Sequence, residues 1–175
     1  MTQINLRKAR PDEMDKVLKL LKEAALWLRG KKINYWQQWL DPPPNFVSWI
    51  QRGFDNDEFF IVEQDGNTAG CFRLQWQDPQ FWGQKIYKAG YIHSFTVKRE
   101  LAGQGTGYKL LKLIEDYCRD NGKNLLRLDC GTDIPGIRKY YEKFGFKWVE
   151  DTVYAGYLTT LYEKQIPKGR RGIWY

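Results

Sequence analysis

The sequence predicts a single α/β domain with a mixed central sheet of about seven strands flanked by helices. Three observations predict it. Stretches typical of strands and helices follow one another in the order β-α-α-β-β-β-α-β-α-β-β. The 175 residues contain no repeat and no linker long enough to divide them, and about 100 to 200 residues is usual for one domain. The hydrophobic share of 42% suffices for a packed core.

The chain opens with a predicted strand and a long helix. Apolar and polar residues alternate over 3–8, as they do in a half-buried strand. Pro11 and Asp12 then suit the start of a helix. Apolar residues recur at helical spacing as far as about Arg29, and Gly30 suits the end of such a helix.

A second helix and a hairpin are predicted next. Residues 34–44 form a bent, partly helical segment, because the three prolines that close it forbid a continuous helix. We expect Asn45 to cap a short helix that ends near Gly53. Two runs typical of strands, 58–63 and 69–77, follow, and the Asp-Gly pair between them indicates a hairpin.

The second half predicts a strand, a glycine-rich loop and a helix, and then four further elements. Alternation in the strand at 88–98 places Tyr91, His93, Phe95 and Val97 on one face. Behind the loop, apolar residues at helical spacing predict a helix that stops at Asn121-Gly122. The remaining elements are a buried strand at 125–130, a helix from Pro135 to Gly145, and a closing pair of strands at 146–153 and 157–165.

Composition limits the classes of function. The net charge of +7 suits nucleic acid, an acidic membrane or one anionic cofactor. The basic residues are scattered and no nucleic-acid recognition motif occurs, so we expect no nucleic acid partner. No apolar run approaches the ~18 residues of a membrane span, and no signal peptide is evident, so a cytoplasmic protein is expected. Three widely spaced cysteines argue against disulfides and against a metal site.

The loop between strand and helix carries the clearest chemistry. Glycines at 103, 105 and 107 remove side chains where the backbone turns. Consecutive N–H groups and the helix N-terminus can then converge on an anion such as a pyrophosphate. The spacing is neither that of a dinucleotide-binding fold nor that of a P-loop. Taken alone, such glycines fit a flexible turn equally well.

Two separated motifs resemble the GNAT superfamily of acetyl-CoA-dependent N-acetyltransferases. One is the strand ending Phe-Thr-Val with the loop 102–107 behind it, and the other is the helix that ends Tyr-Tyr-Glu-Lys-Phe-Gly-Phe at Phe146. The resemblance covers 91–146 closely, and the order of elements outside this region fits the same fold. Two positions depart from the family pattern: Ala102 replaces an arginine or glutamine, and Ile134 replaces an asparagine.

The resemblance implies a binding site for acetyl-CoA as cosubstrate. The strand backbone at Phe95 and Val97 would pair with the pantetheine arm, as a strand edge pairs with an added strand. Backbone N–H groups of the loop would hold the pyrophosphate. The loop residues are Gly103, Gln104, Gly105, Thr106 and Gly107.

The resemblance also implies catalytic roles. Tyr141 matches the tyrosine whose hydroxyl protonates the departing CoA thiolate and also contacts the cofactor, although an ordinary core aromatic is the alternative. The amine must be neutral to attack, and His93, the only histidine, has an ordinary pKa near 6.5 that suits a general base. A packed or surface histidine, with deprotonation through water, is the alternative.

Aromatic residues are the candidates for contacting the acceptor amine, since aromatic faces suit an apolar or cationic group. Hydrophobic packing is the alternative for each of them. The candidates are Trp27, Tyr35, Trp36 and Tyr91.

The resulting prediction is an N-acetyltransferase that moves an acetyl group to a primary amine, of a small molecule or a peptide, by direct attack in a ternary complex. The alternative is a non-catalytic CoA-binding module of the same fold. The catalytic domain is expected to span 1–166 and a basic tail 167–175. The resemblance leaves a homodimer open, and no metal is expected.

Overall fold

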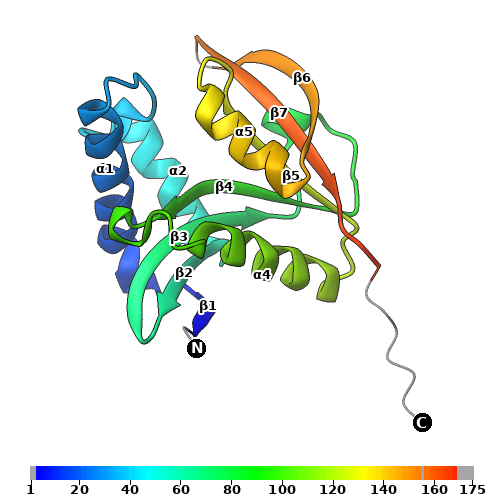
Figure 1. The fold of residues 1–175 in the computed structure, drawn as a ribbon, viewed down its shortest axis with the longest axis horizontal. Helices are drawn as coiled ribbons and strands as arrows, with labels where there is room; N and C mark the ends of the chain where they lie inside the picture. Colours follow the sequence, from blue (N-terminus) through cyan, green and yellow to red (C-terminus); the bar gives the residue numbers. More distant parts are fainter. Residues whose placement is uncertain (1–2, 155, 169–175) are drawn as a thin grey trace. The chain divides into compact units, whose positions relative to one another are not determined.

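The structure, a computed structural model, describes residues 3–154 and 156–168. Figure 1 shows its helices and strands. The strands are β1 (Ile4–Lys8), β2 (Phe59–Gln64), β3 (Asn67–Gln75), β4 (Ala89–Val97), β5 (Leu125–Gly131), β6 (Lys147–Tyr154) and β7 (Tyr157–Gln165). The α-helices are α1 (Met14–Gly30), α2 (Pro44–Asp55), α3 (Pro79–Trp82), α4 (Thr106–Asp120) and α5 (Pro135–Phe144). Short 3₁₀ turns are η1 (Pro11–Glu13), η2 (Gln37–Trp39) and η3 (Arg99–Leu101).

The predicted α/β fold with a seven-stranded sheet is confirmed. The strand order in the sheet is β1-β2-β3-β4-β5-β7-β6. Contacts divide the chain into two compact units. The N-terminal unit comprises the described residues up to Leu74 together with Ile92–Leu110, and the C-terminal unit comprises Gln75–Tyr91 together with the described residues from Leu111 onward. The domain boundary at residue 166 stays a prediction, and 169–175 of the predicted tail lie outside the described residues.

The N-terminal unit packs α1 and α2 onto an antiparallel β1-β2-β3 arrangement. Its strands pair in a register that places Leu6 opposite Val62 and Val62 opposite Gly70, and the two helices lie side by side (Figure 1). The buried core comes from α1, α2 and the inner strands. Its members include Val17, Leu20, Leu21, Ile50, Phe54, Phe59, Ile61 and Cys71.

The second helix differs from its prediction at both ends. It begins at Pro44, after Pro43, with no side-chain cap, so the prediction that Asn45 caps it is wrong. Proline suits a first helical position because its fixed φ is already helical and its missing N–H has no partner there. The helix continues through Gly53 to Asp55. A Cβ at position 53 would lie 2.5 Å from the Phe59 ring, so this glycine permits close packing and does not end the helix.

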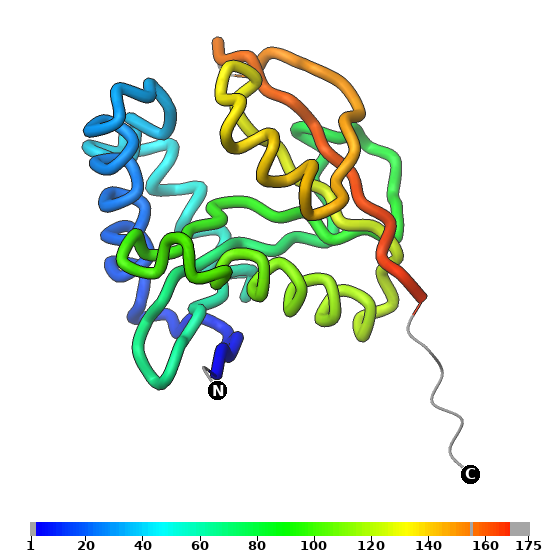
Figure 2. Tube along the Cα trace, viewed as in Figure 1, coloured from blue at the N-terminus to red at the C-terminus, as the bar shows by residue number. Residues whose placement is uncertain are grey.

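The C-terminal unit contains the predicted closing strands, and both are confirmed. β7 pairs antiparallel with β5 and with β6, and the trace runs from α5 into this hairpin (Figure 2). The carboxylate of Glu115 on α4 is almost fully buried and is bonded by Lys112 and by Lys164 of β7. Burial acts to raise the pKa of Glu115, but these two ammonium groups outweigh it and keep the pKa below its ordinary value. The carboxylate therefore stays charged and ties the helix to the strand.

Candidate active site

The glycine-rich loop lies between β4 and α4 in the N-terminal unit. Gly103 and Gly105 have φ of +78° and +75°, a region that side chains other than glycine rarely adopt. The α4 helix begins at Thr106, whose buried hydroxyl donates to Gln64 Oε1 at 3.1 Å and fixes the first turn against β2. The first N–H groups of a helix have no partner within it. This arrangement suits an anion at the exposed loop.

The backbone of β4 departs from regular strand geometry just before the loop. Ser94 has a φ of +52°, so the strict alternation that placed four side chains on one face does not continue past it. Beyond this point Phe95 is half-buried and Val97 is 8% exposed. The Val97 carbonyl accepts a hydrogen bond from Arg99 Nη2 at 3.0 Å. The sequence pattern does not predict the positive φ of Ser94, because serine is not a residue that favours positive φ.

His93 directly precedes Ser94 and is half-buried. Its ring meets the indole of Trp49 on α2 edge to face, with centroids 5.9 Å apart and planes at 84°. Sequence reasoning missed Trp49, because helical periodicity assigned it only to the apolar face of a short helix. The general-base role of His93 stays a prediction.

Three of the predicted acceptor-site aromatics belong to the N-terminal unit. Trp27 on α1 is 39% exposed, and the guanidinium of Arg99 lies over its ring at 4.7 Å. The ring therefore already has a cation from the protein. Tyr35 and Trp36 stack with centroids 5.9 Å apart. The Nε2 of Gln37 donates to the Tyr35 carbonyl at 2.9 Å and to an α1 carbonyl at 3.2 Å, which holds the bent segment on the helix.

The other two predicted site residues, Tyr141 and Tyr91, belong to the C-terminal unit. Tyr141 lies on α5 and is 5% exposed, with its ring against Tyr140 at 5.5 Å and Phe146 at 5.8 Å. Gly145 ends the helix with a φ of +105°, as its place in the motif predicts. The Tyr141 ring thus has the packing of a core aromatic, and its acid role stays a prediction.

Tyr91 is also a core residue of the C-terminal unit. It is 2% exposed, its hydroxyl accepts a hydrogen bond from Arg127 Nη1 at 3.2 Å, and its ring lies 6.1 Å from that of Trp82. The guanidinium of Arg127 also lies 4.0 Å from the Tyr87 ring and pairs with Glu163 at 2.6 Å. These contacts explain Tyr91 as part of a buried cation–aromatic cluster, and its acceptor role stays a prediction.

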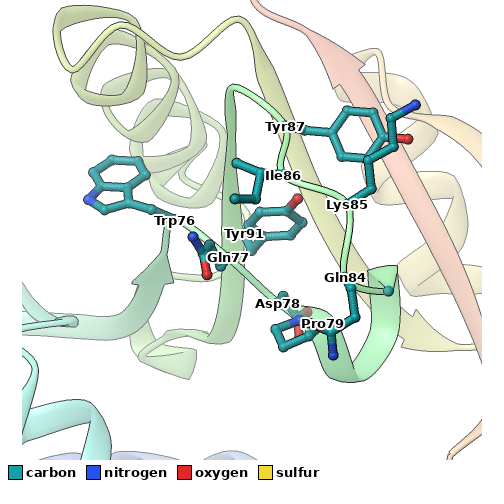
Figure 3. Close-up of a pocket in the computed structure, with 10 residues that line it drawn as sticks. Trp76, Gln77, Asp78, Pro79, Gln84, Lys85, Ile86, Tyr87 and Tyr91 are labelled. Atoms are coloured by element: carbon teal, nitrogen blue, oxygen red, sulfur yellow. The ribbon is translucent and has the colours of Figure 1, made fainter.

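A shallow hollow beside Tyr91 was not predicted from the sequence. Figure 3 shows it between the end of β3, the segment around α3 and the start of β4. Asp78, which is 7% exposed, is the acidic residue among those that line it. The residues that line it are Trp76, Gln77, Asp78, Pro79, Gly83, Gln84, Lys85, Ile86, Tyr87 and Tyr91.

The cysteines are poor nucleophiles. Cys71, Cys118 and Cys130 are free and buried, and burial raises the pKa of each thiol to about 12. Within residues 3–154 and 156–168, no group of three or more His, Cys, Asp or Glu side chains is placed to hold a metal ion. No helix of this described part is long and apolar enough to cross a membrane.

The chain is similar to known proteins in sequence and in fold. A family model described as the acetyltransferase (GNAT) family matches residues 18–146. The uncharacterized N-acetyltransferase YesJ of Bacillus subtilis is 27% identical over 161 residues, which cover 89% of this chain and 86% of that protein. A GNAT family acetyltransferase structure from Listeria monocytogenes has a TM-score of 0.73 at 20% identity, with 93% of this chain and 94% of that chain covered.

A second solved structure was determined with a bound molecule. It is the PaiA N-acetyltransferase of Thermoplasma acidophilum in complex with coenzyme A. Its TM-score is 0.62 at 19% identity, with 93% of this chain and 99% of that chain covered. At these identities the two structures show a shared fold.

Proposed function

The chain belongs to the acetyltransferase (GNAT) family, and from this premise we propose that it moves an acetyl group from acetyl-CoA to a primary amine by direct attack in a ternary complex. The observation that carries the proposal is the glycine-rich loop between β4 and α4, with positive φ at Gly103 and Gly105. The loop has the sequence motif and the backbone shape that an anion-binding turn needs.

Acetyl-CoA is the proposed cosubstrate. Backbone N–H groups of Gly103–Gly107 would hold its pyrophosphate, and this role survives the loss of a side-chain donor at Ala102. The β4 backbone around Phe95 and Val97 would pair with the pantetheine. The coenzyme A complex of the PaiA enzyme supports this choice by analogy of fold.

His93 is the proposed general base. An ammonium ion has no lone pair, so the acceptor must lose a proton before it attacks the thioester carbon. The imidazole takes that proton on a ring nitrogen, whose lone pair is available near neutral pH because the ordinary pKa of a histidine is about 6.5. His93 is half-buried, so part of the residue is accessible.

Tyr141 is the proposed general acid. When the tetrahedral intermediate collapses, the carbon–sulfur bond breaks and the CoA thiolate leaves. The phenol hydroxyl donates its proton to that sulfur, and its ordinary pKa near 10 lies close to that of a thiol. The support is the motif that ends at Gly145 and Phe146, which the structure forms as a helix with a glycine stop.

Direct transfer is favoured over a covalent acetyl-cysteine. That route needs a thiolate, and the described cysteines are buried with pKa values raised to about 12. Free cysteines also fit the cytoplasm that we propose as the location.

The acceptor is proposed only as a class, a primary amine of a small molecule or a peptide. The half-exposed aromatics of α1 and of the segment after it, Trp27, Tyr35 and Trp36, are the proposed acceptor contacts.

The second candidate function is a CoA-binding module without catalysis. It is favoured by Ala102 and Ile134, where this chain lacks two polar side chains of the family pattern.

Amine-dependent release of free CoA thiol tests the proposal. Purified protein is mixed with acetyl-CoA and a panel of primary amines, and the acetylated product is identified by mass spectrometry. We expect thiol release above the amine-free rate for at least one amine, with an equal amount of acetylated amine. Calorimetric binding of acetyl-CoA without thiol release for any amine would favour the binding module.

A further inference from the structure

Trp49 of α2 joins a buried cation to the histidine of β4. The guanidinium of Arg73 lies 4.1 Å from the centroid of the indole, over its ring. The Phe59 ring meets the indole edge to face, with centroids 6.3 Å apart and planes at 89°. The His93 ring also meets it edge to face, with centroids 5.9 Å apart and planes at 84°. All four residues belong to the N-terminal unit. The indole is therefore held on one side and contacts the proposed base on another.

The buried cation is itself fixed. Arg73 on β3 is 3% exposed, and its Nε and Nη2 bond Glu58 Oε2 at 2.7 Å and 2.5 Å. Its Nη1 donates to the main-chain carbonyl of Trp49 at 2.9 Å. The same guanidinium thus holds both the backbone and the ring of one residue. A planar group with five donors in a fixed geometry suits such a task better than a lysine would.

The helix approaches β3 closely at this point. Gly53 lies one turn after Trp49, and a Cβ there would be 2.9 Å from Arg73 Nε and 2.5 Å from the Phe59 ring. Only a residue without a side chain allows the approach. The position of the indole therefore follows from close packing and hydrogen bonding, and the ring has little freedom to move.

The consequence concerns the orientation of His93. An imidazole acts as a base only when the lone pair of one ring nitrogen points at the proton it removes. Ser94, the next residue, has a φ of +52°, so the backbone departs from regular strand geometry directly after the histidine. A nearly perpendicular contact with a fixed indole restricts rotation of the ring.

We propose that Trp49 is a positioning residue that holds the His93 ring in the orientation needed to deprotonate the amine, with the Glu58–Arg73 pair as its anchor. The inference rests on the proposed function, in which His93 is the general base. It adds a residue that touches neither substrate in the proposed scheme.

A double-mutant cycle tests whether Trp49 acts through His93. His93→Ala should lower kcat by about 10²-fold, the contribution usual for a general base. Trp49→Leu should lower kcat by about tenfold in the otherwise unchanged protein, with the KM for acetyl-CoA unchanged, because misorientation of a reacting group reduces the rate without removing a proposed contact to acetyl-CoA. In the His93→Ala background, Trp49→Leu should have little further effect.

Equal losses from Trp49→Leu in both backgrounds would overturn the inference, and so would an unchanged rate in the otherwise unchanged protein. An unchanged rate in His93→Ala would remove the base role and the inference with it. Trp49→Phe is the second variant in case Trp49→Leu fails to fold. It keeps an aromatic edge and should retain more of the rate than the leucine variant.

The matched control is Trp76→Leu in the C-terminal unit. Trp76 is also a half-buried indole, with Tyr117 stacked on it at 6.3 Å and the Lys123 ammonium 4.7 Å from its centroid. Its removal costs similar packing and a similar cation contact. We expect kcat to be unchanged in this variant, since the ring contacts described for Trp76 are with Tyr117 and Lys123.

A readout without turnover separates this inference from the proposed function. Because His93 is the only histidine, imidazole signals in an NMR spectrum report it alone. We expect one sharp set of signals in the unchanged protein and in Trp76→Leu, and broadened or multiple sets in Trp49→Leu. An equally sharp single set in Trp49→Leu would overturn the inference. If the spectra are as expected but no amine is acetylated, the proposed function is contradicted while the positioning of the ring by Trp49 is supported.

Discussion

Single residues carry the proposed chemistry: the Tyr141 ring packs against Tyr140 and Phe146, and the His93 ring meets the indole of Trp49. Tyr141 was predicted from a motif, and His93 from its place on the strand and the ordinary pKa of a histidine. The edge contact between Trp49 and His93 could not be predicted, because it joins a helix to a strand more than forty positions away in the sequence. Tyr91 was predicted as an acceptor contact from its place on the strand. Its hydrogen bond from Arg127 instead makes it part of a buried cluster.

Replacement of Tyr141 by phenylalanine tests the proposed acid. The variant keeps the ring that packs against Tyr140 and Phe146 and removes only the hydroxyl. We expect kcat to fall by about 10²-fold, with the dissociation constant for acetyl-CoA nearly unchanged. Steady-state kinetics and calorimetric binding are the measurements. Turnover equal to that of the unchanged protein at saturating acetyl-CoA would remove Tyr141 as the acid.

Glu13 is a residue for which the structure predicts a pH dependence of stability. Its carboxylate is 3% exposed and bonds Arg7 at 2.7 Å and Lys16 at 2.6 Å. The hydrogen bond from Arg7 lowers the pKa of Glu13 most, burial opposes this, and Lys16 adds to it, so the pKa lies well below its ordinary value of 4.5. A carboxyl group with a depressed pKa stabilises the fold above its unfolded pKa, and the stabilisation is lost as pH falls toward the folded value.

Glu13→Gln should therefore lower the free energy of unfolding by about 1–3 kcal/mol at pH 7. The difference from the unchanged protein should shrink as pH falls below about 4.5, where the unfolded carboxyl is protonated. Urea denaturation across pH measures it. The matched control is Glu23→Gln, at an exposed position of the helix α1 that follows Glu13, with an expected change within about 0.5 kcal/mol. A difference for Glu13→Gln that is independent of pH would contradict the account.

At the scale of elements, periodicity predicts most helices and strands and fails where tertiary packing decides. The strands β6 and β7 and the helix α5 were predicted within a few residues, because their signals are local. The helix α2 runs to Asp55, two residues past the predicted end near Gly53, because Gly53 serves the contact with Phe59 and Arg73, which its sequence neighbours do not indicate. The positive φ of Ser94 within β4 is a second feature that periodicity does not predict.

The loop before α4 can be tested by a change in its backbone. Gly105 has a φ of +75°, and no atom lies within 4 Å of the point that a Cβ would occupy, so alanine fits in space but is strained in conformation. We expect Gly105→Ala to raise the KM for acetyl-CoA by about tenfold and to lower stability by about 1 kcal/mol.

Gly122→Ala is the matched control, since Gly122 lies just beyond the other end of α4 with a φ of +73° and equally open surroundings. It should lower stability by a similar amount and leave the KM for acetyl-CoA unchanged. Equal KM values for the two variants would show that the loop does not hold the cosubstrate.

For the molecule as a whole, the seven-stranded α/β fold was predicted from the order of elements, and the family from two separated motifs. Charge gave less. The net charge of +7 suits a polyanionic cosubstrate, but many basic groups are already paired: Lys112 with Glu115 and Asp116, and Arg127 with Glu163. Pairing depends on the fold, so the sequence could not separate cations available to a ligand from those that hold helices and strands together.

The most direct test of the central claim is the initial-rate pattern with both substrates varied. For an amine that supports thiol release, rates are measured over a grid of acetyl-CoA and amine concentrations, with the acetylated amine quantified as product. Direct transfer in a ternary complex predicts double-reciprocal lines that intersect, and no acetylated protein in the intact mass after incubation with acetyl-CoA alone. Parallel lines together with an acetylated protein would contradict the account.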